Sequence, residues 1–294
     1  MIFKRFYYFL INSNIYISLA AVFLTVQAQI QLGMHPQWHP YLFIIFFATM
    51  LEYNFHRLIT LWFRKEILAD EKYTWLRNNI PAFYTIMIFS VLGFFAALVF
   101  AKTQVIIILL PIGLITIFYS LPIFKIKKKL FRLREISILK IFLISSIWAL
   151  STVLLPVIQS DKSFDKINIL LMLTERMLFV FAITIPFDIR DIESDRNAKL
   201  KTIPLLMGEK KALQMAIFSL ILFAVLCIAH YIKTPLLYTL PALIISAVTT
   251  FIFMVNNKLK KTTYYYYGIL DGTMFFQGLM VIISYYIFVI KTTC

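Results

Sequence analysis

Residues 80–101 read IPAFYTIMIFSVLGFFAALVFA and contain no charged side chain. A helix of about 20 apolar residues spans the hydrocarbon core of a bilayer, where only helices and closed barrels satisfy their backbone groups. Eight further apolar runs fill most of the chain, near residues 8–32, 38–61, 104–122, 136–158, 167–187, 212–231, 236–256 and 268–290. The sequence therefore predicts an all-α, polytopic membrane bundle of nine transmembrane helices.

Composition supports this class. The 294 residues are 61% hydrophobic and 15% charged, whereas soluble domains contain about 25% charged residues. No linker or shift in composition marks a boundary, so we expect a single helical domain over residues 1–294. The first run follows Lys4 and Arg5 directly. It is too long and too aromatic for a cleaved signal peptide, and we expect a retained helix.

The net charge of +15 follows a topological pattern. Lys and Arg gather on alternate connections, with 22 of the 29 on one side of the predicted bundle and five on the other. The positive-inside rule then places the N-terminus in the cytoplasm and the C-terminus outside, in a bacterial inner or plasma membrane. Topology and anionic lipid headgroups account for the charge, so we expect membrane lipids and no nucleic acid as partners.

Residues 185–204, after the sixth run, read IPFDIRDIESDRNAKLKTIP. The spacing of Asp188, Asp191 and Asp195 puts three carboxylates on one helical face. Their mutual repulsion favours a divalent cation such as Mg²⁺, which takes carboxylate and phosphate oxygens together. Basic neighbours that would favour a phosphate-bearing ligand are Arg190, Arg196, Lys199 and Lys201. From spacing alone, a solvated loop of mixed charge is an equal alternative.

The same stretch, with Gly208 after it, resembles the second aspartate-rich motif of the UbiA-type intramembrane prenyltransferases. Residues 119–127, YSLPIFKIK, are similar to the Tyr-then-Lys segment that follows helix four in this family. Asp271 stands where a late acidic residue of helix nine is expected. Nine helices with an inward N-terminus match the layout of the family.

The resemblance implies an Mg²⁺-dependent enzyme that moves an isoprenyl group from a prenyl diphosphate to a lipophilic acceptor, which is an aromatic quinone precursor or a lipid. It implies that Mg²⁺ is held by Asp188, Asp191 and Asp195. The catalytic residues that it implies are Asp191, Asp195, Lys125 and Tyr119. The residues that it implies for binding the diphosphate are Asn54, Arg57, Arg196 and Lys201.

The first aspartate-rich motif of the family, Asn-x-x-x-Asp-x-x-x-Asp, is degenerate. In LEYNFHRLITLW, residues 51–62, Asn54 matches its Asn, but Leu58 and Trp62 occupy the two aspartate positions. Either the neighbouring His56 and Arg57 contact the diphosphate directly, or activity is altered or lost. Arg57 can grip phosphate oxygens bidentately. An interfacial pair of snorkelling side chains is the alternative reading.

Charged residues inside spanning helices are costly and face a cavity or one another. The runs contain or adjoin five of them: Glu52, Lys140, Glu175, Arg176 and Asp271. We expect Arg176 to form a buried pair with Glu52. Three functions remain open: a prenyltransferase, a non-catalytic family member that binds lipid or acts as a scaffold, and a transporter. No pair of helices broken by Gly and Pro marks a transport site.

Overall fold

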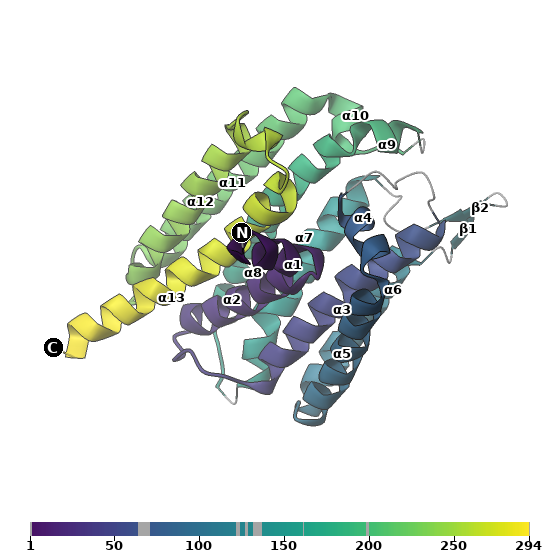
Figure 1. The fold of residues 1–294 in the computed structure, drawn as a ribbon. Helices are drawn as coiled ribbons and strands as arrows, with labels where there is room; N and C mark the ends of the chain where they lie inside the picture. The colour runs from purple at the N-terminus through teal and green to yellow at the C-terminus, as the bar shows by residue number, and fades with distance from the viewer. Residues whose placement is uncertain are drawn as a thin grey trace.

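The protein is described by a computed structural model covering residues 2–63, 71–121, 124–126, 129–131, 137–160, 162–197 and 200–293. Helices dominate it (Figure 1), and their bounds are, in chain order, α1 Ile2–Asn12, α2 Ile15–Gln31, α3 Pro40–Phe63, α4 Glu71–Asn78, α5 Ile80–Val99, α6 Thr103–Ser120, α7 Ser137–Gln159, α8 Lys166–Arg190, α9 Ile192–Asn197, α10 Ile203–Met207, α11 Glu209–Tyr231, α12 Leu240–Val255 and α13 Gly272–Thr293. Short 3₁₀ turns η3 and η4 span Leu237–Thr239 and Leu259–Lys261, and a π-helical turn, η5, spans Tyr265–Leu270.

Eight of the nine predicted apolar runs each lie mainly on one helix, and the first is divided between α1 and α2. In the described part of the chain, seven helices are long and apolar enough to cross a bilayer. The bent pair α1 and α2 would make an eighth, and α6 is a shorter apolar helix. The predicted helical membrane bundle is thus confirmed, with nine as an approximate count. A two-stranded antiparallel hairpin, β1 Phe124–Ile126 and β2 Lys129–Phe131, is a small departure from the all-α prediction.

The helices close into a ring. Going round it, α2 contacts α3, α3 contacts α7, α7 contacts α8, α8 contacts α11, and α12 and α13 complete the path back to α2. Helix α5 packs on the outside of α3, and α6 packs on α7. At Gly278 of α13 a Cβ atom would lie 2.6 Å from the backbone carbonyl of Phe23. A glycine there lets α13 and α2 approach closely, as small residues do between membrane helices.

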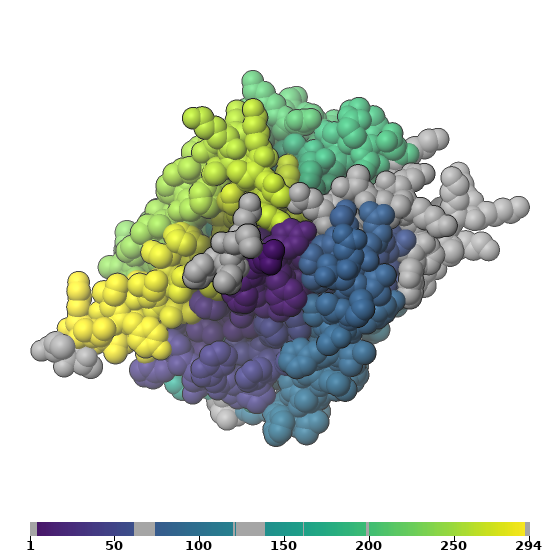
Figure 2. Space-filling view, in the orientation of Figure 1, coloured from purple at the N-terminus to yellow at the C-terminus, as the bar shows by residue number. Residues whose placement is uncertain are grey.

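The first predicted run is not one straight helix. Helices α1 and α2 meet at an angle of 73°. Between them, Asn14 has a φ of 64° in the left-handed region, which asparagine adopts more readily than most residues. In Figure 2 this N-terminal segment (purple) lies between the C-terminal helix (yellow) and the blue helices α4 and α5.

The outer surface is strongly apolar. Helix α5 exposes Phe89, Leu92 and Phe95, and α11 and α12 expose further large apolar side chains. Such a surface on helices of spanning length belongs in lipid, so the chain is an integral membrane protein. Figure 1 shows α4, α9, α10 and the hairpin at one end of the bundle. These are the connections in which the sequence concentrates Lys and Arg.

Candidate functional site

A cavity of about 270 Å³, here called the polar cavity, lies where α3, α6, α7, α8 and α13 converge. Asn14, just before α2, and residues of α9 and η5 also reach it. Its charged and aromatic lining residues are Tyr53, His56, Arg57, Tyr119, Lys140, Trp148, Phe187, Asp188, Arg190, Asp191, Asp195, Tyr267 and Asp271. Residues distant in sequence thus meet in one charged space inside an apolar bundle.

The three aspartates of the second motif all line this cavity, although no single helix carries them. Helix α8 ends at Arg190, and the N–H of the next residue, Asp191, donates to the carbonyl of Phe187 over 3.0 Å. Asp195 lies in α9, and its N–H donates to the carbonyl of Asp191 over 2.8 Å. These bonds continue a nearly helical path, so the carboxylates still reach one cavity, as their spacing predicts.

Asp188 forms an ion pair with a residue outside the motif. The ammonium of Lys140, on α7, donates to Asp188 Oδ1 over 2.5 Å, and the aspartate is fully buried. Among the described residues, Asp188 Oδ2 has no hydrogen-bond partner. A buried carboxylate oxygen without a donor is costly, so this oxygen is suited to a ligand that brings positive charge or a proton.

Arg190 and Asp191 are joined at the cavity rim. Arg190 donates from Nε and Nη2 to the two carboxylate oxygens of Asp191, over 2.7 and 3.1 Å. Its guanidinium also lies 5.3, 4.8 and 5.0 Å from the ring centroids of Phe187, Tyr266 and Tyr267. Such stacking holds a guanidinium in place while leaving it at the cavity surface.

Asn54 and Arg57 connect the cavity to the break between α1 and α2. Asn54 accepts a bond from Asn14 Nδ2 at 2.9 Å and donates to the carbonyl of Ser13 at 3.0 Å. Arg57 donates to the carbonyl of Asn12 at 2.5 Å and to Asn14 Oδ1 at 3.0 Å. Both residues are buried, and Arg57 also lines the polar cavity. They hold the bent N-terminal segment against α3.

The position of the first missing aspartate is filled by an apolar contact. Leu58 is buried in a cluster with Trp75 and Leu76 of α4 and Phe83 of α5. This face of α3 therefore packs against α4 and α5 and contributes no side chain to the polar cavity at that position. At this position the family motif has a carboxylate, and this chain has a leucine that packs against α4 and α5.

The other residues named from the sequence are placed differently. Tyr119 lines the polar cavity, with its ring 6.1 Å from that of His56. Lys125 lies in β1, and its side chain lies outside the described residues. Arg196 and Lys201 are both exposed and do not line the cavity; Arg196 pairs with exposed Glu193 at 2.9 Å.

The charged residues of the polar cavity allow a test of whether it could hold Mg²⁺. Its described lining holds three Lys or Arg side chains and four Asp carboxylates, a formal charge of −1. A diphosphate would add further negative charge, so a cation has to accompany it. Among the described residues, no group of three acidic, His or Cys side chains could hold a metal alone. Mg²⁺ is usually bound by one or two carboxylates together with substrate phosphates. The residues fit an ion of that kind, held by the motif aspartates and a diphosphate jointly.

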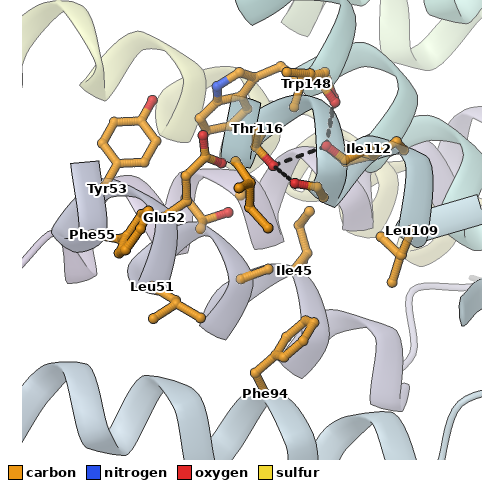
Figure 3. Close-up of a pocket in the computed structure, with 17 residues that line it drawn as sticks. Ile45, Leu51, Glu52, Tyr53, Phe55, Phe94, Leu109, Ile112, Thr116 and Trp148 are labelled. Atoms are coloured by element: carbon orange, nitrogen blue, oxygen red, sulfur yellow. Dashed lines mark hydrogen bonds between the residues drawn. The ribbon is translucent and has the colours of Figure 1, made fainter. Parts of the chain in front are cut away.

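A second cavity of about 360 Å³, here called the apolar chamber, lies beside the first between α2, α3, α5, α6 and α7. Figure 3 shows its walls, which include Ile45, Leu109 and Phe94. Tyr53 and Trp148 line both cavities. These two aromatic side chains therefore lie where a charged space and an apolar one adjoin.

Far from the polar cavity along α8 lies another group of buried polar side chains, here called the distal cluster. Glu175 Oε1 lies 2.6 Å from His230 Nδ1, whose Nε2 lies 2.7 Å from Asn168 Oδ1. Glu175 Oε2 accepts from Tyr231 at 3.1 Å and from Gln31 at 3.4 Å. The cluster ties α2, α8 and α11 together.

Arg176, which follows Glu175 on α8, does not have the partner that the sequence led us to expect. Arg176 donates to the carbonyl of Leu24 over 3.1 Å, and within the described residues it forms no ion pair with Glu52. Glu52 instead lines the apolar chamber. The predicted pair is wrong because Arg176 faces α2 deep in the bundle, whereas Glu52 faces α6 and α7.

A family model described as the UbiA prenyltransferase family matches residues 79–279, which is more than half of the chain. The chain belongs to the UbiA prenyltransferase family. The match begins after the degenerate first motif and includes the whole of the second. A search of curated protein sequences found no significant match.

Solved structures share the UbiA fold at low sequence identity. A digeranylgeranylglyceryl phosphate synthase structure aligns with a TM-score of 0.55 and 15% identity, over 93% of this chain and 98% of that one. A UbiA homologue from Archaeoglobus fulgidus, bound to DMAPP and Mg²⁺, gives 0.58 and 12%, over 90% and 96%. An apo UbiA homologue from Aeropyrum pernix K1 gives 0.55 and 13%, over 95% and 98%. These likenesses establish the fold of the bundle.

The sequence did not assign Lys140, Arg190, Tyr53 or Trp148 to the UbiA site, although all four line the polar cavity. Lys140 carried a signal, since a lysine among the apolar residues of α7 needs a partner. Arg190 was visible as one of the basic neighbours of the motif. Tyr53 and Trp148 carried no signal, because aromatic residues are abundant in this chain, with 29 Phe and 16 Tyr. Only the fold shows that they line both cavities.

Proposed function

We propose that the chain transfers an isoprenyl group from a prenyl diphosphate to a lipophilic acceptor, within quinone or lipid metabolism. The observation that carries this proposal is that the polar cavity and the apolar chamber adjoin at Tyr53 and Trp148. A prenyl diphosphate has one strongly charged end and one hydrocarbon end. Two adjoining cavities of matching character would hold its reacting carbon at their boundary.

In this proposal the diphosphate lies in the polar cavity, where Arg57, Lys140 and Arg190 offset its charge. Asp188, Asp191 and Asp195 would hold Mg²⁺, which supplies charge stabilisation to the departing diphosphate. Lys140 keeps the Asp188 carboxylate oriented, and Arg190 does the same for Asp191.

The reaction breaks the bond between prenyl C1 and the diphosphate oxygen, and the electron pair leaves with diphosphate. The acceptor forms a new bond to C1 and releases a proton. Trp148 and Tyr53 would present their ring faces to the allylic cation. Aromatic ring faces attract cations. The apolar walls exclude water, which would otherwise capture the cation. We propose Tyr119, at the cavity wall, and Lys125, after α6, as further contacts of the diphosphate.

The test uses the full chain in lipid nanodiscs with dimethylallyl, geranyl, farnesyl and geranylgeranyl diphosphate, and a total lipid extract as the source of acceptor. We expect Mg²⁺-dependent release of diphosphate with at least one of them, and saturable binding of the matching thiodiphosphate. If none of the four prenyl chains supports binding as its thiodiphosphate, the proposal is overturned. Binding without release would identify a non-catalytic member of the family.

A further inference from the structure

A third cavity, here called the surface groove, lies on the outside of the bundle between α3 and α5, which pack side by side (Figure 1). Its volume is about 400 Å³. The residues of α3 that line it end at Phe47, whereas those that line the polar cavity begin at Tyr53. The two cavities share no described residue, and the groove lies toward the opposite end of α3.

The sides of the surface groove are apolar. Phe43 and Phe47 of α3 line it together with Ala96 and Phe100 of α5. At Gly93 a Cβ atom would lie 2.5 Å from the ring of Phe47, so this ring packs directly on the backbone of α5. The lining residues of α3 cover about two helical turns, or roughly 10 Å, of the ~15 Å of hydrocarbon in one leaflet. A groove of this length on a lipid-facing helix pair suits a hydrocarbon chain.

The end of the groove at the start of α3 is polar and positively charged. His39 lines it and stacks its ring on that of Tyr41, with 4.6 Å between the ring centroids. Lys102, just before α6, interacts electrostatically with His39 and donates to the carbonyl of Gln159 at 2.8 Å. The N-terminus of α6 adds partial positive charge beside it. The described lining contains no acidic side chain.

The position of this end in the bilayer is indicated by Trp38, which also lines the groove and is exposed. Its ring stacks on that of Phe43, with 6.1 Å between the centroids. Tryptophan is enriched at the level of the lipid headgroups. The positive end of the groove therefore lies at the depth where phospholipids carry their phosphates, and its apolar sides run into the hydrocarbon.

The chemistry of the occupant follows from these two parts. An uncharged lipid or an apolar helix would cover the aromatic sides but would gain nothing from the positive end. A glycerophospholipid has an acyl chain for the sides and a phosphate for the end. An ammonium attracts phosphate strongly where both are partly removed from water.

We propose that the surface groove binds one glycerophospholipid, with an acyl chain between α3 and α5 and its phosphate at His39 and Lys102. The site is independent of the proposed prenyl transfer, because it shares no described residue with the polar cavity. A ligand that binds only the folded chain stabilises it. The lipid should therefore also stabilise the packing of α5 on the outside of α3.

The experiment follows one residue of the groove. The full chain is labelled with 5-fluorotryptophan in dodecyl maltoside, and the ¹⁹F signal of Trp38 is assigned with Trp38→Phe. Dioleoyl phosphatidylglycerol and dioleoylglycerol, which have the same acyl chains, are then titrated separately. Contacts to a charged group favour the phospholipid by about tenfold or more, so we expect a saturable shift of the Trp38 signal with at least this preference.

Two variants test the two parts of the groove. Lys102→Gln should lower the affinity for the phospholipid by about tenfold, whereas Lys233→Gln, at an exposed position after α11, should leave it unchanged. Ala96→Phe, at an exposed position in the lining, should fill the groove and abolish the saturable shift. Ala229→Phe, at an exposed position on α11, is its matched control.

Thermal unfolding of the same samples checks that every variant is folded. The absence of a saturable Trp38 shift in the wild type, or equal affinities for the two lipids, would overturn the inference. So would wild-type affinity in either folded variant, Lys102→Gln or Ala96→Phe. A shift produced by inorganic phosphate alone, at the same concentration as the lipid, would also overturn it by showing an anion site that needs no acyl chain.

Discussion

The polar cavity and the distal cluster both bury charged groups between membrane helices, but they leave them in different states. In the distal cluster, Glu175 is surrounded by His230, Tyr231 and Gln31, which together contact both of its oxygens. In the polar cavity, Asp188 has one oxygen on Lys140 and the other without a partner among the described residues. A satisfied network rigidifies a fold, whereas an unsatisfied buried group beside a cavity indicates a ligand. The polar cavity should therefore serve ligand binding, and the distal cluster should serve the stability of the fold.

The largest effect is expected in the polar cavity. Asp191→Asn keeps the shape of the side chain but removes the charge that would hold Mg²⁺. Loss of such a charged contact should lower diphosphate release by about 100-fold or more, with little change in thermal stability. Release assays and thermal unfolding of the same preparations measure both. Wild-type release by this variant would mean that the motif is only a charged loop.

The distal cluster should show the opposite pattern. Glu175→Leu removes the partner of His230 and Tyr231 and leaves polar groups buried. We expect the free energy of unfolding to fall by about 3 kcal/mol, while the folded fraction still binds farnesyl thiodiphosphate like the wild type. Thermal unfolding and ligand titration distinguish the two quantities. A selective loss of ligand affinity at unchanged stability would assign the cluster to the substrate path and break the comparison.

Arg57 lines the polar cavity and also holds the bend between α1 and α2, so its variants test whether it serves ligand binding or stability. If its guanidinium grips the diphosphate, Arg57→Lys keeps the charge but not the fork, and thiodiphosphate affinity should fall about tenfold. Arg57→Leu should abolish binding in a protein that still folds. Should Arg57→Leu lower the unfolding temperature without changing affinity, Arg57 only anchors Asn12 and Asn14 at the helix break.

The smallest perturbation tests whether the two regions lie on opposite sides of the membrane. Single cysteines at positions 127 and 163, in a background with Cys227 and Cys294 replaced by serine, should react from opposite sides with a membrane-impermeant maleimide. We expect position 127 to be cytoplasmic, because basic residues gather around it. Labelling of both from one side would contradict the predicted topology.

Much of the bundle was predictable because lipid permits few structures. Long apolar runs have to form helices, and each run does. The motif spacing placed Asp188, Asp191 and Asp195 in one cavity, because a near-helical backbone carries them there. The bend at Asn14 was not predictable, since a positive φ leaves little trace in sequence.

Long-range pairing was the harder part of the site. Lys140 and Asp188 are 48 residues apart, and only the packing of α7 on α8 brings them together. The expected pairing of Arg176 with Glu52 was wrong for the same reason, because helix rotation decides which buried charge meets which. Leu58 shows a third limit: its sequence position predicts a lost ligand, but its packing against α4 and α5 appears only in the fold.

The outer wall of the apolar chamber has a kinetic consequence. Helices α5 and α6, which supply Phe94 and Leu109 to that wall, pack on only one side of the ring and turn many large side chains outward. In the proposed transfer, a lipophilic acceptor that crosses this wall would enter from the bilayer and not from water. Its effective concentration is then a mole fraction in the lipid, so the apparent KM, expressed as total acceptor, should scale with the total amount of lipid and not with assay volume.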